Sequence, residues 1–244
     1  MKKQLLYQIG IFLNTILMFV SCVHGDIKVR GYGSKIEETR YLKGFTEIES
    51  DIDADIDIYY SQKDSIVIEA QENILEILET EVRSGKLDIE YSVNVKEHDG
   101  VYIKIYVAEL DGIILKGVGD IVLVDTFLAD NLFIDLRGVG DIVCEDITAN
   151  NIDINLSGSG DIELYGTEVE ELDIDLSGVG DINTYGILAD EVDVNHSGVG
   201  KCKIRFVSIL DIKITGVGDV YYIGNPRYVH SSISGIGNVI NDNN

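Results

Sequence analysis

Aspartates that follow pairs of glycines are the residues of this 244-residue chain whose types and spacing point most directly to chemistry. Residues 155–162, NLSGSGDI, contain one Gly-X-Gly-Asp motif, and Asp120, Asp141 and Asp181 end three others. A glycine-rich turn can hold a phosphate, and a set of carboxylates can bind a cation or supply the acid and base of glycoside cleavage. These motifs are therefore either a ligand site or part of the scaffold.

A nucleotide site does not fit the motif. The dinucleotide-binding turn is Gly-X-Gly-X-X-Gly and opens a helix, whereas here an alternating strand pattern follows each glycine pair. The calcium-binding β-roll does not fit either, because its repeat is only about nine residues long.

A less specific cation ladder remains open. If Asp120, Asp141, Asp161 and Asp181 stack ~4.8 Å apart, adjacent carboxylates repel each other by ~1 kcal/mol in water. We expect solvent, and a hydrogen bond from a neighbouring backbone N–H to each carboxylate, to relieve this repulsion. Bound calcium is the alternative.

One repeat carries other reactive side chains. His196, Lys201 and Cys202 stand where the preceding repeat has Leu, Asp and Ile. A His/Cys zinc site needs at least three protein ligands, and no further His or Cys falls at an equivalent position of the adjacent repeats. We therefore expect a polar core position here. The tyrosines could offer faces for sugar stacking, but we expect them to serve packing, with Tyr165 and Tyr185 stacked as a pair.

The recurrence of the motif defines the elements that must position these residues. The first glycines are Gly117, Gly138, Gly158, Gly178, Gly198, Gly216 and Gly235, at intervals of 18 to 21 residues. Such regularity is typical of a solenoid in which each repeat forms one coil. The sequence thus predicts an all-β fold, a parallel β-helix with coils of about 20 residues and a Gly-X-Gly-Asp corner in each.

Alternation of apolar and polar residues indicates which side chains face the core. In the repeat of Gly158, the inward residues should be Ile154, Leu156 and Ile162, and the same columns recur in the other repeats. Polar residues between them, such as Asp135 and Asn155, should face outward. Cys144 and Cys202 lie in different columns about three coils, or ~14 Å, apart, whereas a disulfide needs Cα atoms within ~7 Å. We predict two free, buried thiols.

The net charge of the chain limits the classes of partner that it can bind. The sequence has 43 acidic and 19 basic residues, for a net charge of -24, and no tryptophan. This charge repels nucleic acids and anionic lipid headgroups, so no nucleic-acid partner is expected.

Residues 1–22 are expected to be a signal peptide. Two lysines precede an apolar run that is shorter than the ~20 residues of a membrane span. Cys22 directly follows that run, after Ser21, as at a bacterial lipoprotein cleavage site. We expect a lipid anchor at Cys22 as the membrane contact, with cleavage near Gly25 and a soluble product as the alternative.

Residues 26–110 form a β-rich segment without the motif, and residues 111–240 form the repeat solenoid. Alternation in the first segment predicts four strands around Ile56, Ile66, Ile89 and Ile103, and residues 73–82, NILEILETEV, fit one short amphipathic helix capped by Asn73. No linker rich in Pro, Gly or Ser separates the two segments, so the sheet should continue from one into the other.

These features together resemble a known bacterial family. The residues that carry the resemblance are 38–48 (ETRYLKGFTEI), 66–82 (IVIEAQENILEILETEV) and the succession of Gly-X-Gly-Asp turns. They are similar to the family called putative auto-transporter adhesin, head GIN domain, an exported domain of unknown function, over roughly residues 28–240. The resemblance implies a right-handed β-helix at the outer membrane, the cell surface or in the periplasm, and it implies binding. It supplies no catalytic residues, and Lys201 and Asn238 depart from the Asp of the motif.

We therefore expect a non-enzymatic envelope protein that recognises a glycan or a protein partner with the flat sides of a solenoid. The alternatives are a β-helix carbohydrate-active enzyme, either a polysaccharide lyase or a hydrolase, and a structural spacer. No cofactor is expected apart from the calcium considered above, and the sequence indicates no oligomeric state.

Overall fold

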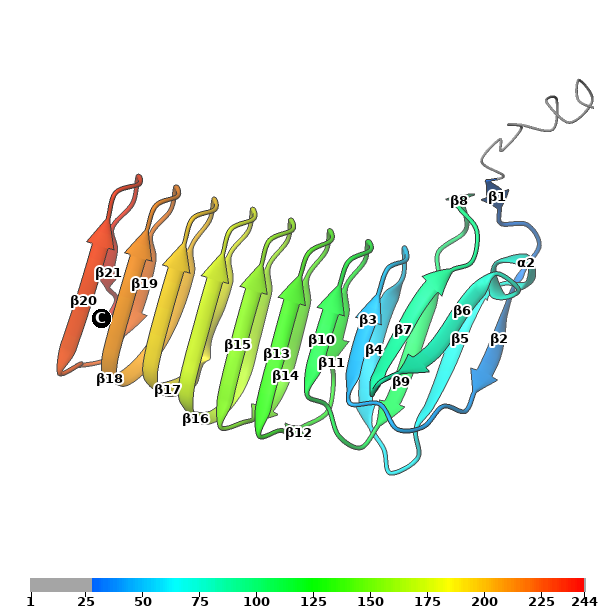
Figure 1. The fold of residues 1–244 in the computed structure, drawn as a ribbon, viewed down its shortest axis with the longest axis horizontal. Coiled ribbons are helices and arrows are strands. Elements are labelled where there is room, and N and C mark those ends of the chain that lie inside the picture. The colour runs from blue at the N-terminus through cyan, green and yellow to red at the C-terminus, as the bar shows by residue number, and fades with distance from the viewer. Residues whose placement is uncertain (1–27, 244) are drawn as a thin grey trace, which may run out of the picture.

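The chain winds into a flattened stack of β-coils that advances from its N-terminal to its C-terminal end (Figure 1). The computed structural model describes residues 28–243. The chain rises along the near side and descends along the far side while it advances to the left in Figure 1, which makes the coil right-handed. The predicted right-handed parallel β-helix is thus confirmed.

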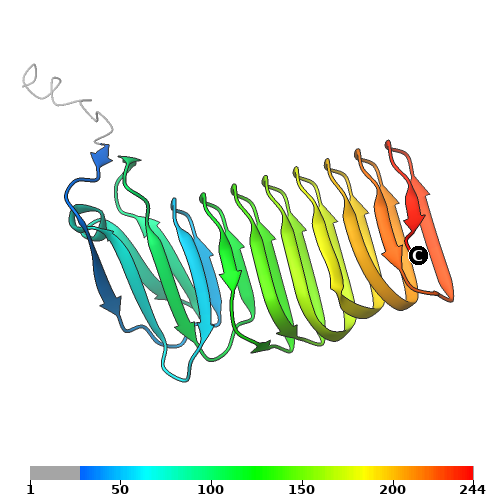
Figure 2. The same cartoon turned by 180° about the vertical axis from the view of Figure 1, so that it is seen from behind.

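Each coil contributes a strand to two opposite rows. Row A contains β7 (Lys86–Tyr91), β3 (Glu47–Ser50), β10 (Gly112–Leu115), β13 (Asn131–Leu136), β15 (Asn151–Leu156), the second halves of β16 (Ile162–Leu176), β17 (Ile182–His196) and β18 (Cys202–Ile214), and β20 (Tyr228–Ile233). Row B contains β5 (Ser65–Gln71), β9 (Tyr102–Val107), β4 (Asp55–Tyr60), β11 (Ile121–Leu123), β14 (Ile142–Thr148), the first halves of β16, β17 and β18, β19 (Val220–Ile223) and β21 (Val239–Asn241). Figure 2 shows the stack from behind, from the side of row B. The short β12 (Phe127–Leu128) lies at the edge between the rows.

Parallel register places equivalent residues of successive coils side by side. Ile134, Ile154 and Ile174 pair in one column that continues to Val194 and Ile212, and all five are buried. The predicted inward columns are confirmed except in the last coil, where Ile233 is 45% exposed. Asp135 is a second departure, because it was expected to face solvent but is fully buried beneath its ion-pair partner Arg137.

The spatial order of the coils differs from the chain order near the N-terminus. β3 and β4 form a coil that lies between the coil of β7 and β9 and the coil of β10 and β11. The turn between β3 and β4 has Ile52 and Ala54 where later turns have glycines, and Asp53 pairs with Val118 of the next turn. One more turn of the same type therefore precedes the seven recognised by their glycines.

The N-terminal end of the stack is closed by antiparallel strands. β2 (Lys35–Arg40) pairs with β5, β5 with β9, and β6 (Leu78–Arg83) with β7. β1 (Val29–Arg30) pairs with β8 (Val95–Glu97) beside them. The four predicted strands of this segment are present as β4, β5, β7 and β9.

The predicted helix over residues 73–82 was wrong in extent. Helix α2 (Glu72–Leu75) makes one turn, and residues 78–83 form strand β6 because they pair with β7. Asn73 does not cap the helix. Its side chain accepts from the N–H of Tyr32 at 3.1 Å and donates to the carbonyl of Arg30 at 2.8 Å, which fastens the N-terminal segment to the end of the stack.

Arg40 contacts the C-terminal end of α2. Its guanidinium donates to the carbonyl oxygens of Leu75 at 3.1 Å and Leu78 at 2.7 Å. Helix termini leave carbonyl groups without partners, so this arginine stabilises the junction between α2 and β6. Arg40, the arginine of the segment 38–48 that resembles the family, therefore has a structural role.

Cys144 and Cys202 are free and buried, as predicted. Burial raises the pKa of both thiols, that of Cys202 to about 12. Among residues 28–243, no helix is long and apolar enough to span a membrane.

Candidate functional site

A shallow groove, largely open to solvent, runs along the edge of the solenoid that the Gly-X-Gly turns form. It has a volume of about 700 Å³ and follows five successive turns. Each turn contributes the residue before its first glycine, that glycine and the next residue, namely residues 116–118, 137–139, 157–159, 177–179 and 197–199. In Figure 1 these turns are the loops that join the upper end of each near strand to the far strand.

Close stacking explains the glycines of these turns. A Cβ on Gly158 would lie 2.2 Å from the carbonyl oxygen of Gly138, and one on Gly160 would lie 1.9 Å from that of Gly140. Gly160 also has a φ of 142°, which disfavours other residues. The glycines therefore serve the scaffold, and they stack the residues between them into a ridge.

The ridge is aliphatic and half exposed. Val118, Val139, Val179 and Val199 are between 49% and 56% exposed, and Ser159 occupies the one remaining place along the groove. Exposed Ser157, Ser177 and Ser197 form a parallel line on the other side of the first glycines. The groove therefore combines an aliphatic wall with a row of hydroxyl groups that repeats at the ~4.8 Å strand spacing.

The charges of the groove are neutralised. Its lining includes no carboxylate, and its two cationic residues, Lys116 and Arg137, pair with Glu49 and Asp135 below it. Burial alone would raise the pKa of Glu49, but hydrogen bonds from Lys116 and Lys86 hold that pKa below its usual range. In a chain of charge -24, the lining of this groove carries no net negative charge.

The aspartates of the motif form a hydrogen-bonded column beside the groove. Oδ1 of Asp120 accepts the backbone N–H of Asp141 at 2.9 Å, and Asp141 and Asp161 accept in the same way from the next aspartate at 2.7 Å. Asp181 accepts from the N–H of Lys201 at 2.8 Å. Each carboxylate thus has the expected backbone N–H partner. The partner belongs to the following coil and not to the coil of the carboxylate itself.

The column begins one coil earlier than the glycines indicate. Asp55 accepts the N–H of Asp120 at 3.2 Å, and at the other end Asp219 accepts from both the backbone and the side chain of Asn238. These two bonds from Asn238 hold the pKa of Asp219 below its usual range. The sequence signal that could have revealed Asp55 is the Asp-Ile pair at residues 55–56, which matches the end of the motif.

A second set of carboxylates lies on the outer surface of row A. Asp153, Asp173, Asp193 and Asp211 pair directly across adjacent strands. Burial, followed by repulsion from Asp173 and other neighbours, raises the pKa of Asp153 and Asp193. This surface is the acidic side of the solenoid, separate from the groove.

The unusual coil around His196 forms no metal site. His196 is fully buried, its Nε2 donates to the carbonyl of Gly200 at 2.8 Å, and its Nδ1 has no protein partner. Across residues 28–243, no group of three or more His, Cys, Asp or Glu side chains is arranged to hold a metal. His196 occupies the polar core position that the sequence indicated.

The tyrosines divide into a cluster and isolated residues. Tyr59 stacks on Tyr106 with ring centroids 5.4 Å apart, and Asp57 accepts the hydroxyls of Tyr59 and Tyr102. The predicted stack of Tyr165 on Tyr185 was wrong, because a register shift pairs Tyr165 with Gly186. Tyr165 instead donates to Glu163 and Tyr185 to Asp242.

A smaller hollow lies where the N-terminal cap meets the first turns. It has a volume of about 470 Å³, and its walls include Asp53, Tyr91, Lys96 and His98. Nδ1 of His98 accepts the N–H of Gly100 at 3.0 Å, while its Nε2 is 3.5 Å from the Tyr91 hydroxyl and 3.7 Å from Asp53. The contact between His98 and Asp53 joins segments far apart in the chain, so no local sequence pattern indicates it.

The predicted signal peptide and the lipid anchor at Cys22 lie outside the described residues.

Comparisons with known proteins agree with this architecture. The model of the family described as "Putative auto-transporter adhesin, head GIN domain" matches residues 44–226. No curated protein matches the chain.

Solved structures show the same fold. The crystal structure of a putative adhesin from Bacteroides fragilis NCTC 9343 is 27% identical, with a TM-score of 0.83, covering 87% of this chain and 99% of that one. A putative adhesin from Parabacteroides merdae ATCC 43184 is 21% identical, with a TM-score of 0.70 and coverage of 88% and 98%. A putative lipid binding protein from Parabacteroides distasonis ATCC 8503 is also 21% identical, with a TM-score of 0.69 and coverage of 88% and 99%.

Proposed function

Because the chain belongs to the putative auto-transporter adhesin, head GIN domain family, we propose that it is an exported, non-enzymatic binding protein that holds a neutral glycan chain in the groove along its turns. The observation that carries the proposal is the lining of the groove. Serine hydroxyls line three of its five turns and valines line four of them, with no carboxylate in the lining.

This lining matches the chemistry of an uncharged sugar chain. Hydroxyl groups at regular spacing can exchange hydrogen bonds with sugar hydroxyls, and the aliphatic ridge can pack against the C–H faces of the rings. A neutral polymer also avoids the repulsion that a chain of charge -24 exerts on polyanions. Repetition along the axis favours a linear partner over a compact one.

The same lining argues against an enzyme. Glycoside cleavage by the common routes needs two carboxyl groups on either side of the scissile bond. The aspartates nearest the groove accept backbone N–H groups in a continuous column, and none of them lines it. Export and anchoring through Cys22 are part of the proposal, since residues 1–22 have the pattern of a lipoprotein signal. Mass spectrometry of the mature N-terminus tests the anchor, because an unmodified Asp26 start would exclude acylated Cys22.

The binding experiment uses a panel of neutral and acidic oligosaccharides, matrix proteins and phosphatidylcholine vesicles, each with and without calcium. We expect neutral glycans to bind and Ser177→Asp to weaken binding at least about tenfold, because it places a charge inside the groove. Asn131→Asp adds the same charge on the outer surface of row A and keeps the oxygen that accepts from Asn151, so it is the matched control and should bind as the wild type does.

Other outcomes would replace the proposal. Release of shorter oligosaccharides would identify an enzyme, and retention on vesicles alone would favour a lipid, the ligand class named for the relative from Parabacteroides distasonis. Binding of a matrix protein without glycans would favour a protein partner. No binding in any arm would favour a spacer.

A further inference from the structure

The last described coil, residues 224–243, ends the stack with two unpaired strand edges. β20 pairs only with β18, and β21 pairs only with β19, among residues 28–243. In Figure 1 these strands form the left end of the stack, and no strand of residues 28–243 follows them. An unpaired edge offers a row of backbone N–H and C=O groups to another strand.

Side chains of this coil that should be core are open to solvent. Val229 pairs with Leu210 and Ile233 with Ile214, and while both partners are fully buried, Val229 is 42% and Ile233 is 45% exposed. Tyr228 and Ile236 at the ends of the coil are 70% and 74% exposed. The end of the stack is therefore a surface in which apolar Val229 and Ile233 alternate with polar Ser231, and it is bounded by two free strand edges.

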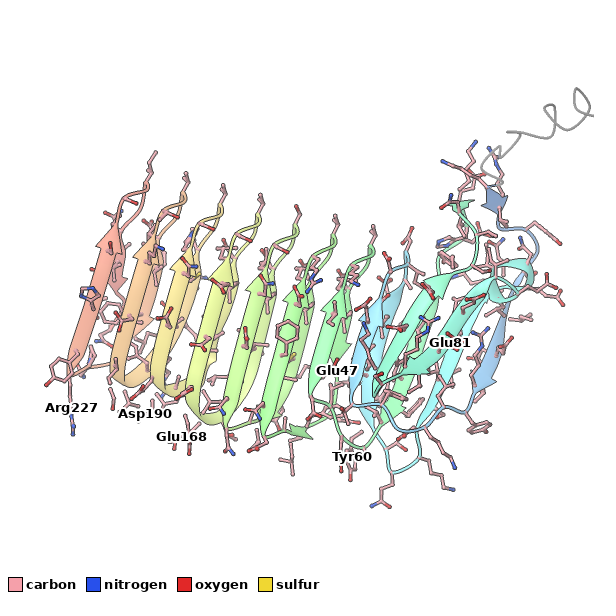
Figure 3. The ribbon with its side chains drawn as sticks, viewed as in Figure 1. Glu47, Tyr60, Glu81, Glu168, Asp190 and Arg227 are labelled. Atoms are coloured by element: carbon pink, nitrogen blue, oxygen red, sulfur yellow. The ribbon has the colours of Figure 1, made fainter. Side chains whose placement is uncertain are left out.

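The acidic columns of the solenoid stop at this coil. The row A column that contains Asp193 and Asp211 ends at His230, and the turn column that contains Asp219 ends at Asn238. The coil has one basic side chain, Arg227, and one acidic side chain, Asp242, apart from His230. Figure 3 shows Arg227 projecting from the lower edge of the coil, away from the strands.

We propose that this coil is the contact surface for a second copy of the chain, joined end to end around a two-fold axis. Two chains of charge -24 repel each other over most of their surfaces, and this end is where the acidic columns are interrupted. A two-fold axis across the joint makes the paired strands of the two copies antiparallel, so both free edges gain hydrogen bonds and the exposed Val229 and Ile233 become covered.

The opposite end explains why assembly stops at two copies. There, β2, β6 and α2 close the stack with antiparallel strands and a helical turn, so the C-terminal coil of another copy finds no matching parallel coil to continue. A head-to-tail contact would build an open filament, whereas contact between two C-terminal ends closes on itself. The inference concerns assembly and holds whether or not the groove binds glycan.

The test measures mass in solution by sedimentation equilibrium over a range of protein concentrations. The purified protein should reach twice the monomer mass by about 100 µM. His230→Asp with Asn238→Asp extends both acidic columns by one coil and should raise the dissociation constant at least about tenfold, with recovery in about 0.5 M salt because salt screens the added charges. Both substitutions copy residues present one coil earlier, so the fold should be retained, and circular dichroism checks this.

The matched control, Asn131→Asp with Asn155→Asp, adds two charges on the outer surface of row A, five and four coils before the last coil, and should dimerise as the wild type does. A wild-type protein that stays monomeric at every concentration would overturn the inference. So would a dimer that the terminal pair leaves unchanged, or one that the control weakens equally, since the contact would then lie elsewhere.

Discussion

Replacement of Arg137 by serine tests the reasoning about buried charge in this solenoid. The guanidinium of Arg137 donates through Nε and Nη2 to Asp135, whose side chain is completely buried while that of Arg137 is half exposed. Oδ1 of Asp135 already lacks a protein partner. Arg137→Ser would therefore leave a buried carboxylate with no compensating charge.

The magnitude follows from the burial of the carboxylate. Removal of one partner of a buried ion pair typically costs 3–5 kcal/mol, and the exposure of Arg137 shifts the expected loss toward the lower end, about 3 kcal/mol. For a chain of this size, that loss corresponds to a fall in Tm of roughly 6–12 °C. The partner substitution Asp135→Asn should rescue most of it, because Asn155 and Ser157 occupy these positions one coil later.

The assay is thermal and urea unfolding of the wild type, the two single variants and the double variant, followed by circular dichroism. The double variant should return to within about 1 kcal/mol of the wild type. If Arg137→Ser stays within about 0.5 kcal/mol of the wild type, or if Asp135→Asn fails to rescue it, the account of Asp135 as a buried, charge-compensated carboxylate is wrong.

Four further outcomes are expected. Gly160→Ala should lower the free energy of unfolding in urea by at least ~2 kcal/mol, because Gly160 has a φ of 142° and the new Cβ would lie 1.9 Å from the Gly140 carbonyl oxygen. Gly44→Ala, the control, should lower it by only ~1 kcal/mol, because Gly44 has a φ of 77° but open space around it. His196→Leu should raise stability by ~1 kcal/mol, because it removes a buried Nδ1 without a partner, and a lower Tm would contradict this. Asp173→Asn should stabilise the protein near pH 7 by ~0.5 kcal/mol, because repulsion from Asp173 helps to raise the pKa of Asp153 and Asp193. A carboxyl pKa that folding raises means that stability falls as pH rises through that pKa. The gain should therefore fade as pH approaches about 4, which unfolding curves at several pH values would show. Millimolar calcium should leave Tm unchanged, because each aspartate of the turn column already accepts a backbone N–H. A rise in Tm that the substitution Asp141→Asn abolishes would instead show that the column binds cations.

The repeat accounts for what the sequence could predict. Because coils stack in register, aligning the motifs on Gly158 and its equivalents also aligned the buried columns, such as that of Ile134, Ile154 and Ile174. The same alignment excluded a disulfide between Cys144 and Cys202 from strand spacing alone. Asp135, which is buried, and the Tyr165–Tyr185 pair, which a register shift separates, are exceptions within the repeats.

The other misses depend on contacts between segments or between coils that a single stretch of sequence does not show. Residues 73–82 have helical periodicity, but pairing with β7 draws residues 78–83 into a strand. Ile52 and Ala54 replace the glycines of the first turn, because the connection from β7 to β9 runs through β8 beside β1 and stacks no tight turn on that side. The groove was also missed, since each motif contributes only three residues to it and its shape arises from five turns together.

The position of the coil formed by β3 and β4 makes the two ends of the solenoid unequal. Both of its neighbours, the coil of β7 and β9 and the coil of β10 and β11, come from later parts of the chain. A chain that folds in N-to-C order must therefore hold residues 47–50 unpaired until residues 86–89 have followed, and residues 55–60 until residues 102–107 have followed. Deletion of coils from the C-terminal side removes one nearest-neighbour contact at a time, whereas loss of β3 and β4 separates the cap from all later coils at once. Growth and shortening of this architecture through evolution should accordingly occur among the repeats after residue 111, with the N-terminal part inherited as one unit.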